Sequence, residues 1–182
     1  TDTIVEDTIV VTDGRPGALA KVGFVNMALI QKKYNYFVRM QANITAKEKK
    51  LYSESQNKNQ ELQNLQMQAA KYEEKAYKNQ GQLDLVDRTK YEDLARDFQE
   101  KSGRYQQEMM KKEDDLALYA QKKNLHYLKN VNSAMSDYGV ENDLDLVQIT
   151  IVSDDNPQLM YFRPEYDVTL KVLEILNAKY NK

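Results

Sequence analysis

The sequence predicts a mainly α-helical protein, in which a long antiparallel coiled-coil hairpin stands on a small β-containing body. Residues 17–156 contain no proline, so long helices are permitted throughout this stretch. A heptad spacing of mostly apolar residues continues through residues 30–83, which is typical of a coiled coil. Short runs of β-branched or alternating residues lie near the two ends of the chain and predict strands there.

The first long helix is predicted over residues 28–80 from one seam of positions spaced alternately four and three residues apart. At about 1.5 Å per residue this helix is roughly 80 Å long, and no globular core of this chain can bury such a rod. We therefore expect it to pair along its length and to act as an arm. The seam positions are Ile30, Tyr34, Phe37, Gln41, Ile44, Glu48, Leu51, Ser55, Lys58, Leu62, Leu65, Ala69, Tyr72, Ala76, Asn79 and Leu83.

The hairpin tip is predicted near residues 81–84, where Gly81 interrupts the pattern and either Asp84 or Asp87 caps the next helix. The second helix is predicted to run to Tyr138 and to end at Gly139. Its seam positions are Tyr91, Leu94, Phe98, Ser102, Tyr105, Met109, Lys112 and Leu116, and after a slip in phase the seam resumes at Tyr127, Val131, Ala134 and Tyr138. The two helices are nearly equal in length, as an antiparallel hairpin requires. The arm thus covers residues 28–138.

The two ends of the chain are predicted to form the body, from residues 20–27 and 139–182. Residues 20–27 read as a buried strand, and residues 147–151 alternate apolar and polar side chains as a half-buried strand does. A further short strand is expected at residues 159–163, and Asp167 is expected to cap a terminal amphipathic helix. Residues 1–19 form a leader that is either an edge strand or flexible.

Such a body is too small to bury a large core alone, so the sequence predicts oligomerisation through it. The residues expected to build this oligomerisation body are Val22, Phe24, Val147, Ile149 and Ile151. Within the arm, the polar seam positions Glu48, Ser55 and Lys58 predict a soft segment, because each missing apolar contact weakens the coiled coil. We expect this segment to act as a hinge.

The composition excludes several classes of function. The chain has 182 residues, no cysteine, a single histidine (His126) and no glycine-rich phosphate loop, so we expect neither catalysis, nor a metal, nor a cofactor. No apolar run is long enough to span a bilayer, and at most peripheral membrane contact is expected. Residues 28–138 carry a net charge of +4 (20 Lys and Arg against 16 Asp and Glu), but the lysine runs are short and neutralised nearby, which argues against nucleic acid.

Two segments near the ends carry a family resemblance. Residues 21–27 read Lys-Val-Gly-Phe-Val-Asn-Met directly before an amphipathic helix. Residues 161–169 read Tyr-Phe-Arg-Pro-Glu-Tyr-Asp-Val-Thr and are followed by Val172-Leu173 and Leu176-Asn177. In this order, with a long hairpin between them, they resemble the Skp/OmpH family of periplasmic chaperones over about residues 21–180. The resemblance implies a homotrimer with a β-body and three helical tentacles, located in the periplasm after removal of a signal peptide.

The resemblance further implies an ATP-independent holdase that keeps unfolded outer-membrane or envelope proteins in the cavity between the arms. The sequence leaves open an alternative, a structural coiled-coil spacer or adaptor that binds one folded partner. Four apolar residues off the seam are the expected client contacts, because methionine and tyrosine bind many sequences weakly. They are Tyr52, Met67, Tyr77 and Met110.

Overall fold

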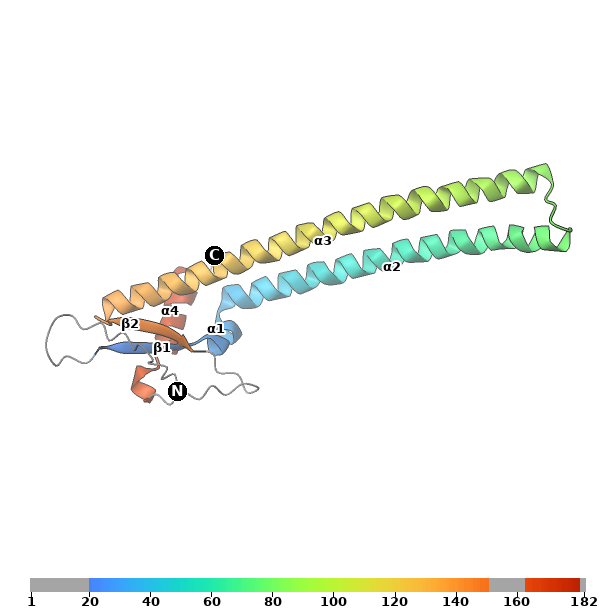
Figure 1. Ribbon diagram of the computed structural model, residues 1–182. Coiled ribbons are helices and arrows are strands. Elements are labelled where there is room, and N and C mark those ends of the chain that lie inside the picture. The colour runs from blue at the N-terminus through green and yellow to red at the C-terminus, as the bar shows by residue number, and fades with distance from the viewer. Residues whose placement is uncertain (1–19, 151–162, 181–182) are drawn as a thin grey trace, which may run out of the picture. The chain divides into compact units, whose positions relative to one another are not determined.

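The computed structural model describes residues 20–150 and 163–180. Its elements follow in the order β1 (Val22–Asn26), α1 (Met27–Lys33), α2 (Asn35–Lys78), α3 (Leu85–Glu141), β2 (Leu146–Thr150), the short 3-10 helix η1 (Pro164–Tyr166) and α4 (Thr169–Lys179). Helices α2 and α3 form a long hairpin, and β1 and β2 form a small parallel pair (Figure 1). The mainly helical architecture predicted from the sequence is confirmed.

The chain divides into two compact units. The base unit contains residues 1–41 and 123–182, and the arm unit contains residues 42–122. Helices α2 and α3 contribute residues to both units. The arm predicted from the sequence, residues 28–138, extends beyond the arm unit at both ends, and those boundaries remain a prediction.

Strand β1 is hydrogen-bonded along both of its edges by segments from the C-terminal part of the chain. It pairs with β2 in parallel, from Val22 opposite Leu146 to Asn26 opposite Thr150. At its other edge, the Val168 N–H donates to the Phe24 carbonyl at 3.0 Å, and the Asn26 N–H donates to Thr169 Oγ1 at 2.8 Å. Within the base unit, β1 near the start of the described residues therefore contacts β2 and the residues that lead into α4.

The core of the base unit is apolar and tightly closed. Its largest fully buried apolar side chains come from β1, α1, the α1–α2 junction, the last part of α3, and α4: Val25, Ile30, Tyr34, Tyr127, Val131, Val172 and Leu176. Helix α4 begins at Thr169, and its N-cap position is Val168, which makes no side-chain cap hydrogen bond, so the predicted cap at Asp167 lies one residue too early. Asp167 still accepts a hydrogen bond from the Thr169 N–H at 2.9 Å. Helix α4 buries Val172, Leu173 and Leu176, whereas Leu170 is exposed.

The first long helix is interrupted at Tyr34, contrary to the continuous helix predicted over residues 28–80. Tyr34 has an extended ψ of 111°, and its ring is buried in the base unit. Its hydroxyl donates to the Tyr180 carbonyl at 2.5 Å and accepts from the Asn130 side chain at 3.0 Å. Asn177 of α4 accepts from the Asn35 N–H at 3.1 Å, so α4 supplies a partner to the backbone at the break.

Of the two boundaries predicted for the second long helix, the start agrees with the structure and the end does not. At the tip, Gly81 adopts φ +85°, and Asp84 Oδ1 accepts from the Asp87 N–H at 2.8 Å, so Asp84 is the cap of α3. The predicted end at Gly139 is wrong, because α3 continues to Glu141 and the chain reverses at Asp143, with φ +51°. Gly139 instead allows β2 to approach, since a Cβ there would lie 3.3 Å from the Val147 side chain.

Three sequence predictions lie outside the described residues. They concern the leader 1–19, the position Ile151, and residues 159–162 of the predicted short strand. Arg163, the last residue of that predicted strand, is described and leads directly into η1.

Candidate functional site

The arm unit is two helices that cover each other on one side only. Among residues 42–122, all of which the structure describes, Leu65 is the one buried apolar residue. The other apolar seam positions of α2 are half-buried: Ile44, Leu51, Leu62, Ala69, Tyr72 and Ala76. The predicted seam therefore faces α3, but most of its side chains keep part of their surface open.

Charged and hydroxyl pairs cross between the helices through the middle of the arm unit. Lys58 Nζ lies 2.6 Å from Glu108 Oε2, and the Lys112 ammonium pairs with Glu54. Further along, Glu61 accepts from Lys101 Nζ at 2.8 Å and also from the Tyr105 hydroxyl. These pairs replace apolar contacts over a stretch where the seam is polar.

Hydrogen bonds from these lysines lower the pKa of three glutamates. The ammonium of Lys112 holds the pKa of Glu54 below its ordinary value, and that of Lys58 does so for Glu108. The hydrogen bonds from Lys101 and Tyr105 lower the pKa of Glu61 in the same way. All three carboxylates are therefore charged at neutral pH and draw the two helices together.

The three predicted hinge residues occupy different environments. Glu48 is exposed and Ser55 is half-buried. The Lys58 side chain is only 16% exposed, and its ammonium lies 4.0 Å from the centre of the Tyr105 ring in addition to its pairing with Glu108. Lys58 is thus a packed and paired residue, while Glu48 leaves its seam position open.

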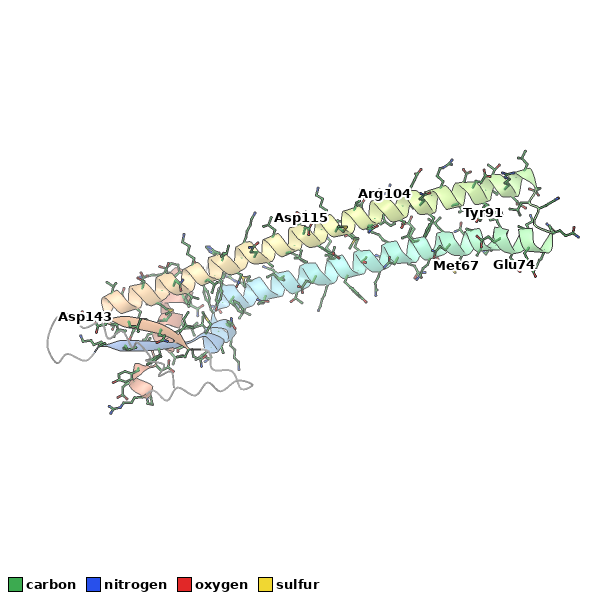
Figure 2. All side chains as sticks on the ribbon, in the orientation of Figure 1. Met67, Glu74, Tyr91, Arg104, Asp115 and Asp143 are labelled. Carbon is green, nitrogen blue, oxygen red and sulfur yellow. The ribbon has the colours of Figure 1, made fainter. Side chains whose placement is uncertain are left out.

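The four predicted client contacts all lie on the surface of the arm unit. Tyr52 is 66% exposed, Met67 57%, Tyr77 87% and Met110 58%. Figure 2 labels Met67 on α2. Leu85 and Val86, at the start of α3, are 80% and 61% exposed and are not among the contacts that the sequence predicts. Their signal was available, because both are large apolar residues that fall outside the seam.

The predicted oligomerisation residues divide between the two faces of the strand pair. Side chains alternate along a strand, so Val22 and Phe24 lie on the face opposite buried Val25. The parallel register places Ile149 beside Val25, so Val147 and Ile149 share its face. All four are half-buried, and Leu146 of β2 is 50% exposed. Among the described strands, β2 pairs with β1 alone.

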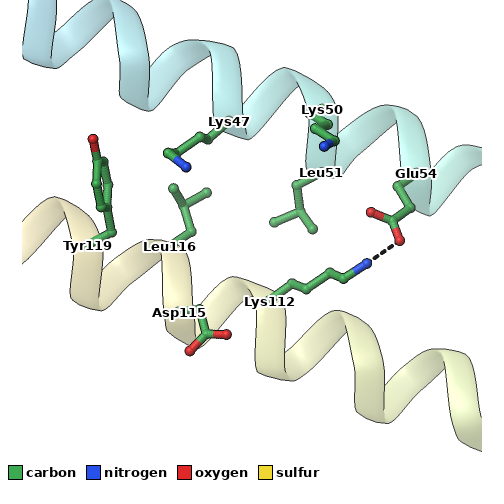
Figure 3. Close-up of a pocket in the computed structure, with 8 residues that line it drawn as sticks. All are labelled: Lys47, Lys50, Leu51, Glu54, Lys112, Asp115, Leu116 and Tyr119. Carbon is green, nitrogen blue, oxygen red and sulfur yellow. Dashed lines mark hydrogen bonds and ion pairs between the residues drawn. The ribbon is translucent and has the colours of Figure 1, made fainter.

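A groove of about 380 Å³ opens between α2 and α3 within the arm unit (Figure 3). Leu51 and Leu116 lie in its middle and point toward one another (Figure 3). The Lys112–Glu54 pair closes one end, and Tyr119 stands at the other with Lys47 Nζ 4.9 Å from the centre of its ring. The remaining lining residues are Lys50 and Asp115.

Other kinds of site find little support in the described part of the chain. Residues 20–150 and 163–180 contain no group of three or more His, Cys, Asp or Glu placed to hold a metal ion. No described helix is both long enough and apolar enough to cross a membrane. His126 is exposed, and its ring packs edge-on against the Tyr36 ring with the two ring centres 5.3 Å apart.

Comparisons with known proteins point to one family. Residues 21–176 match the model of the outer membrane protein (OmpH-like) family. Among solved structures, the fold is similar to the crystal structure of a candidate outer membrane chaperone (OmpH-like) from Caulobacter crescentus CB15, with a TM-score of 0.68 at 13% identity. The match covers 96% of this chain and 94% of that one. Nothing among curated protein sequences matches this chain.

Proposed function

Since the chain belongs to the OmpH-like outer membrane protein family, we propose that it is an ATP-independent holdase chaperone for unfolded outer-membrane and other envelope proteins. The observation that carries this proposal is the arm unit, a long helical hairpin with a single buried apolar residue and several exposed large ones. A holdase needs many weak contacts that release their client, and a half-open seam flanked by exposed tyrosine and methionine offers such contacts.

The proposed client contacts are the four exposed residues Tyr52, Met67, Tyr77 and Met110. Each presents an amphipathic ring or a polarizable sulfur that adapts to different sequences. They are spread over both helices of the arm unit. We propose that an extended unfolded chain touches several of them at once, so that weak individual affinities add through avidity.

The proposed working form is a homotrimer in the periplasm, with the client held between three helical arms. Support for assembly through the base unit comes from β2, which has a half-exposed Leu146 and, among the described strands, one partner only. An unpaired strand edge is a ready site for pairing with another chain. We propose no catalytic step, no cofactor and no nucleic-acid partner, and only peripheral contact with membranes.

We also propose that the arm is softest between residues 46 and 60. The support is the exposed Glu48 and the half-buried Ser55, which leave Leu51 as the one apolar seam contact between them. A cavity that takes clients of different sizes needs such a hinge, and functional motion draws on the least stable part of a fold.

An aggregation assay tests this function. Several unrelated outer-membrane β-barrels are diluted from urea, and light scattering is followed with and without the protein, in the absence of nucleotide. The holdase keeps all of them soluble at near-stoichiometric amounts. A protein that suppresses none of them and instead binds one folded partner in a fixed ratio is the structural spacer or adaptor, and that outcome rejects the proposal.

A further inference from the structure

We propose that the groove between α2 and α3 (Figure 3) receives an aromatic side chain of an unfolded client, with a neighbouring client carboxylate held by Lys50. This inference rests on the proposed holdase function and names one subsite and its preferred client chemistry. All eight residues that line the groove belong to the arm unit.

The groove lies along a stretch of the coiled coil where one seam position of each helix carries a charged side chain, Glu48 on α2 and Lys112 on α3. Glu48 is exposed, and Lys112 of α3 is engaged with Glu54. In a regular coiled coil each seam side chain fills a hole in the partner helix, so a missing one leaves its hole empty. Leu51 and Leu116 consequently stay half-buried, with apolar surface that an incoming side chain can cover.

The walls favour an aromatic occupant over an aliphatic one. The Tyr119 ring at one end offers a surface for offset or edge-on contact with a second ring. The Lys47 ammonium lies 4.9 Å from the centre of that ring, in a cation–π contact. A second aromatic ring in the groove would make the same kind of contact with this ammonium. A groove of about 380 Å³ is at the lower end of the sizes that accommodate small ligand groups.

The charges at the rim favour an acidic neighbour. Three ammonium groups (Lys47, Lys50 and Lys112) and two carboxylates (Glu54 and Asp115) line the groove, which leaves an excess of one positive charge. Lys47 faces the Tyr119 ring and Lys112 pairs with Glu54. No ion pair involves Lys50 within the described residues, so its ammonium is the one best placed for a client carboxylate.

Short fluorescent peptides test the site on the full-length assembled protein by fluorescence anisotropy. The probe peptide carries one phenylalanine between two glutamates, and two matched peptides replace the phenylalanine by serine or the glutamates by lysines. The aromatic acidic peptide is expected to bind about threefold to tenfold more tightly than either matched peptide. Equal binding of the three peptides overturns the proposal.

Variants assign the preference to the groove. Tyr119→Leu keeps an apolar wall and removes the ring, so it is expected to weaken the preference for phenylalanine over serine. Lys50→Glu is expected to reverse the preference from glutamate to lysine flanks. Lys71→Glu, the same change at an exposed position of α2 outside the groove, is the control and leaves both preferences in place. If Tyr119→Leu and Lys50→Glu behave like Lys71→Glu, the groove is not the site.

Two further outcomes distinguish a failure of the proposed subsite from a failure of the proposed holdase function. A protein that prefers the aromatic acidic peptide but suppresses no aggregation keeps the subsite and loses the holdase role. A holdase whose groove variants show unchanged peptide preferences keeps its role and loses this subsite. Crosslinks between Lys50 and Asp115 of different copies would show the groove covered by a second copy, which also overturns the proposal.

Discussion

In the base unit, segments from distant parts of the chain close one core in which Tyr34, Tyr127 and Leu176 are fully buried. In the arm unit, two helices face only each other, and Leu65 is the one buried apolar residue among residues 42–122, all of them described. Both units continue the same helices, so helix propensity does not distinguish them. What differs is the number of neighbouring segments that each seam side chain can contact.

This difference indicates that the base unit is the more stable part and the arm unit the more easily rearranged one. Burial removes apolar surface from water, and side chains closed on all sides gain far more from it than half-covered ones. The arm unit compensates with ion pairs such as Lys58–Glu108 and Lys101–Glu61, which hold the register but contribute little each. We therefore expect the arm to rearrange at a lower free-energy cost than the base, as the proposed holdase function requires.

The largest effect is expected from a charge within the strand pair of the base unit. Ile149→Asp places an unpaired carboxylate on the face that β2 shares with buried Val25, at a cost of several kcal/mol. The proposed trimer, of about 64 kDa (three times 21.2 kDa), should dissociate or unfold in light scattering and circular dichroism. Gln148→Asp, at an exposed neighbouring position, is the control and should keep the trimer. An Ile149→Asp protein that remains a folded trimer would show that this face carries no assembly.

A pair of truncations sharpens the comparison of the two units directly. Leu176→Ala in the base unit should cost about 2–5 kcal/mol of unfolding free energy, because it opens a cavity in a closed core. Leu62→Ala on the half-buried seam of the arm unit should cost less, about 1 kcal/mol, because water can fill the space. Urea denaturation of both variants measures this difference. Equal losses would mean that the arm is packed as firmly as the base.

Filling the polar seam should stiffen the arm. Ser55→Leu combined with Lys58→Leu adds apolar contacts worth about 1–3 kcal/mol each, less the lost Lys58–Glu108 pair. The variant should exchange amide hydrogens more slowly over residues 46–60 and protect a narrower size range of clients in the aggregation assay. Lys49→Leu with Ser53→Leu, at exposed positions of the same helix, is the matched control. If the filled arm protects large and small clients equally well, the hinge has no functional role.

Lowering the pH should loosen the arm, and this is the smallest of the expected effects. The pKa values of Glu54, Glu61 and Glu108 are lowered in the fold, so their stabilisation is present above the ordinary glutamate pKa of about 4.3 and is lost as pH falls through the lower folded values. Spin labels at exposed Asn57 and Lys111 should show a broader distance distribution at acid pH. The double variant Glu54→Gln with Glu108→Gln should lose most of this change. If the double variant still shows the full broadening at acid pH, groups other than Glu54 and Glu108 cause it.

The sequence predicts the local parts of this fold well and the long-range parts poorly. The heptad pattern predicts the hairpin, and Asp84 is one of the two caps that the sequence predicts for α3, because both features depend on residues close in sequence. The break at Tyr34 was missed because its partners Asn177 and Tyr180 are more than 140 residues away in the chain.

For the candidate site, the sequence predicts the exposed positions but not the pairs between helices. Tyr52 and Met67 are recognisable because they fall off the seam. The Lys112–Glu54 pair and the groove beside it depend on the register of α2 against α3, which neither seam fixes alone. For the same reason the sequence predicts Lys58 only as a polar gap in the seam, although its ammonium packs against the Tyr105 ring.

Hydrogen exchange followed by mass spectrometry tests the contrast between the two units most directly, since it measures both in one experiment. We expect residues 127–135 and 170–176 of the base unit to exchange most slowly, residues 62–76 of the arm faster, and residues 46–60 fastest. Adding an unfolded β-barrel client should slow exchange in the arm and leave the base unchanged. Uniform protection along the arm, at the level of the base, would contradict the account.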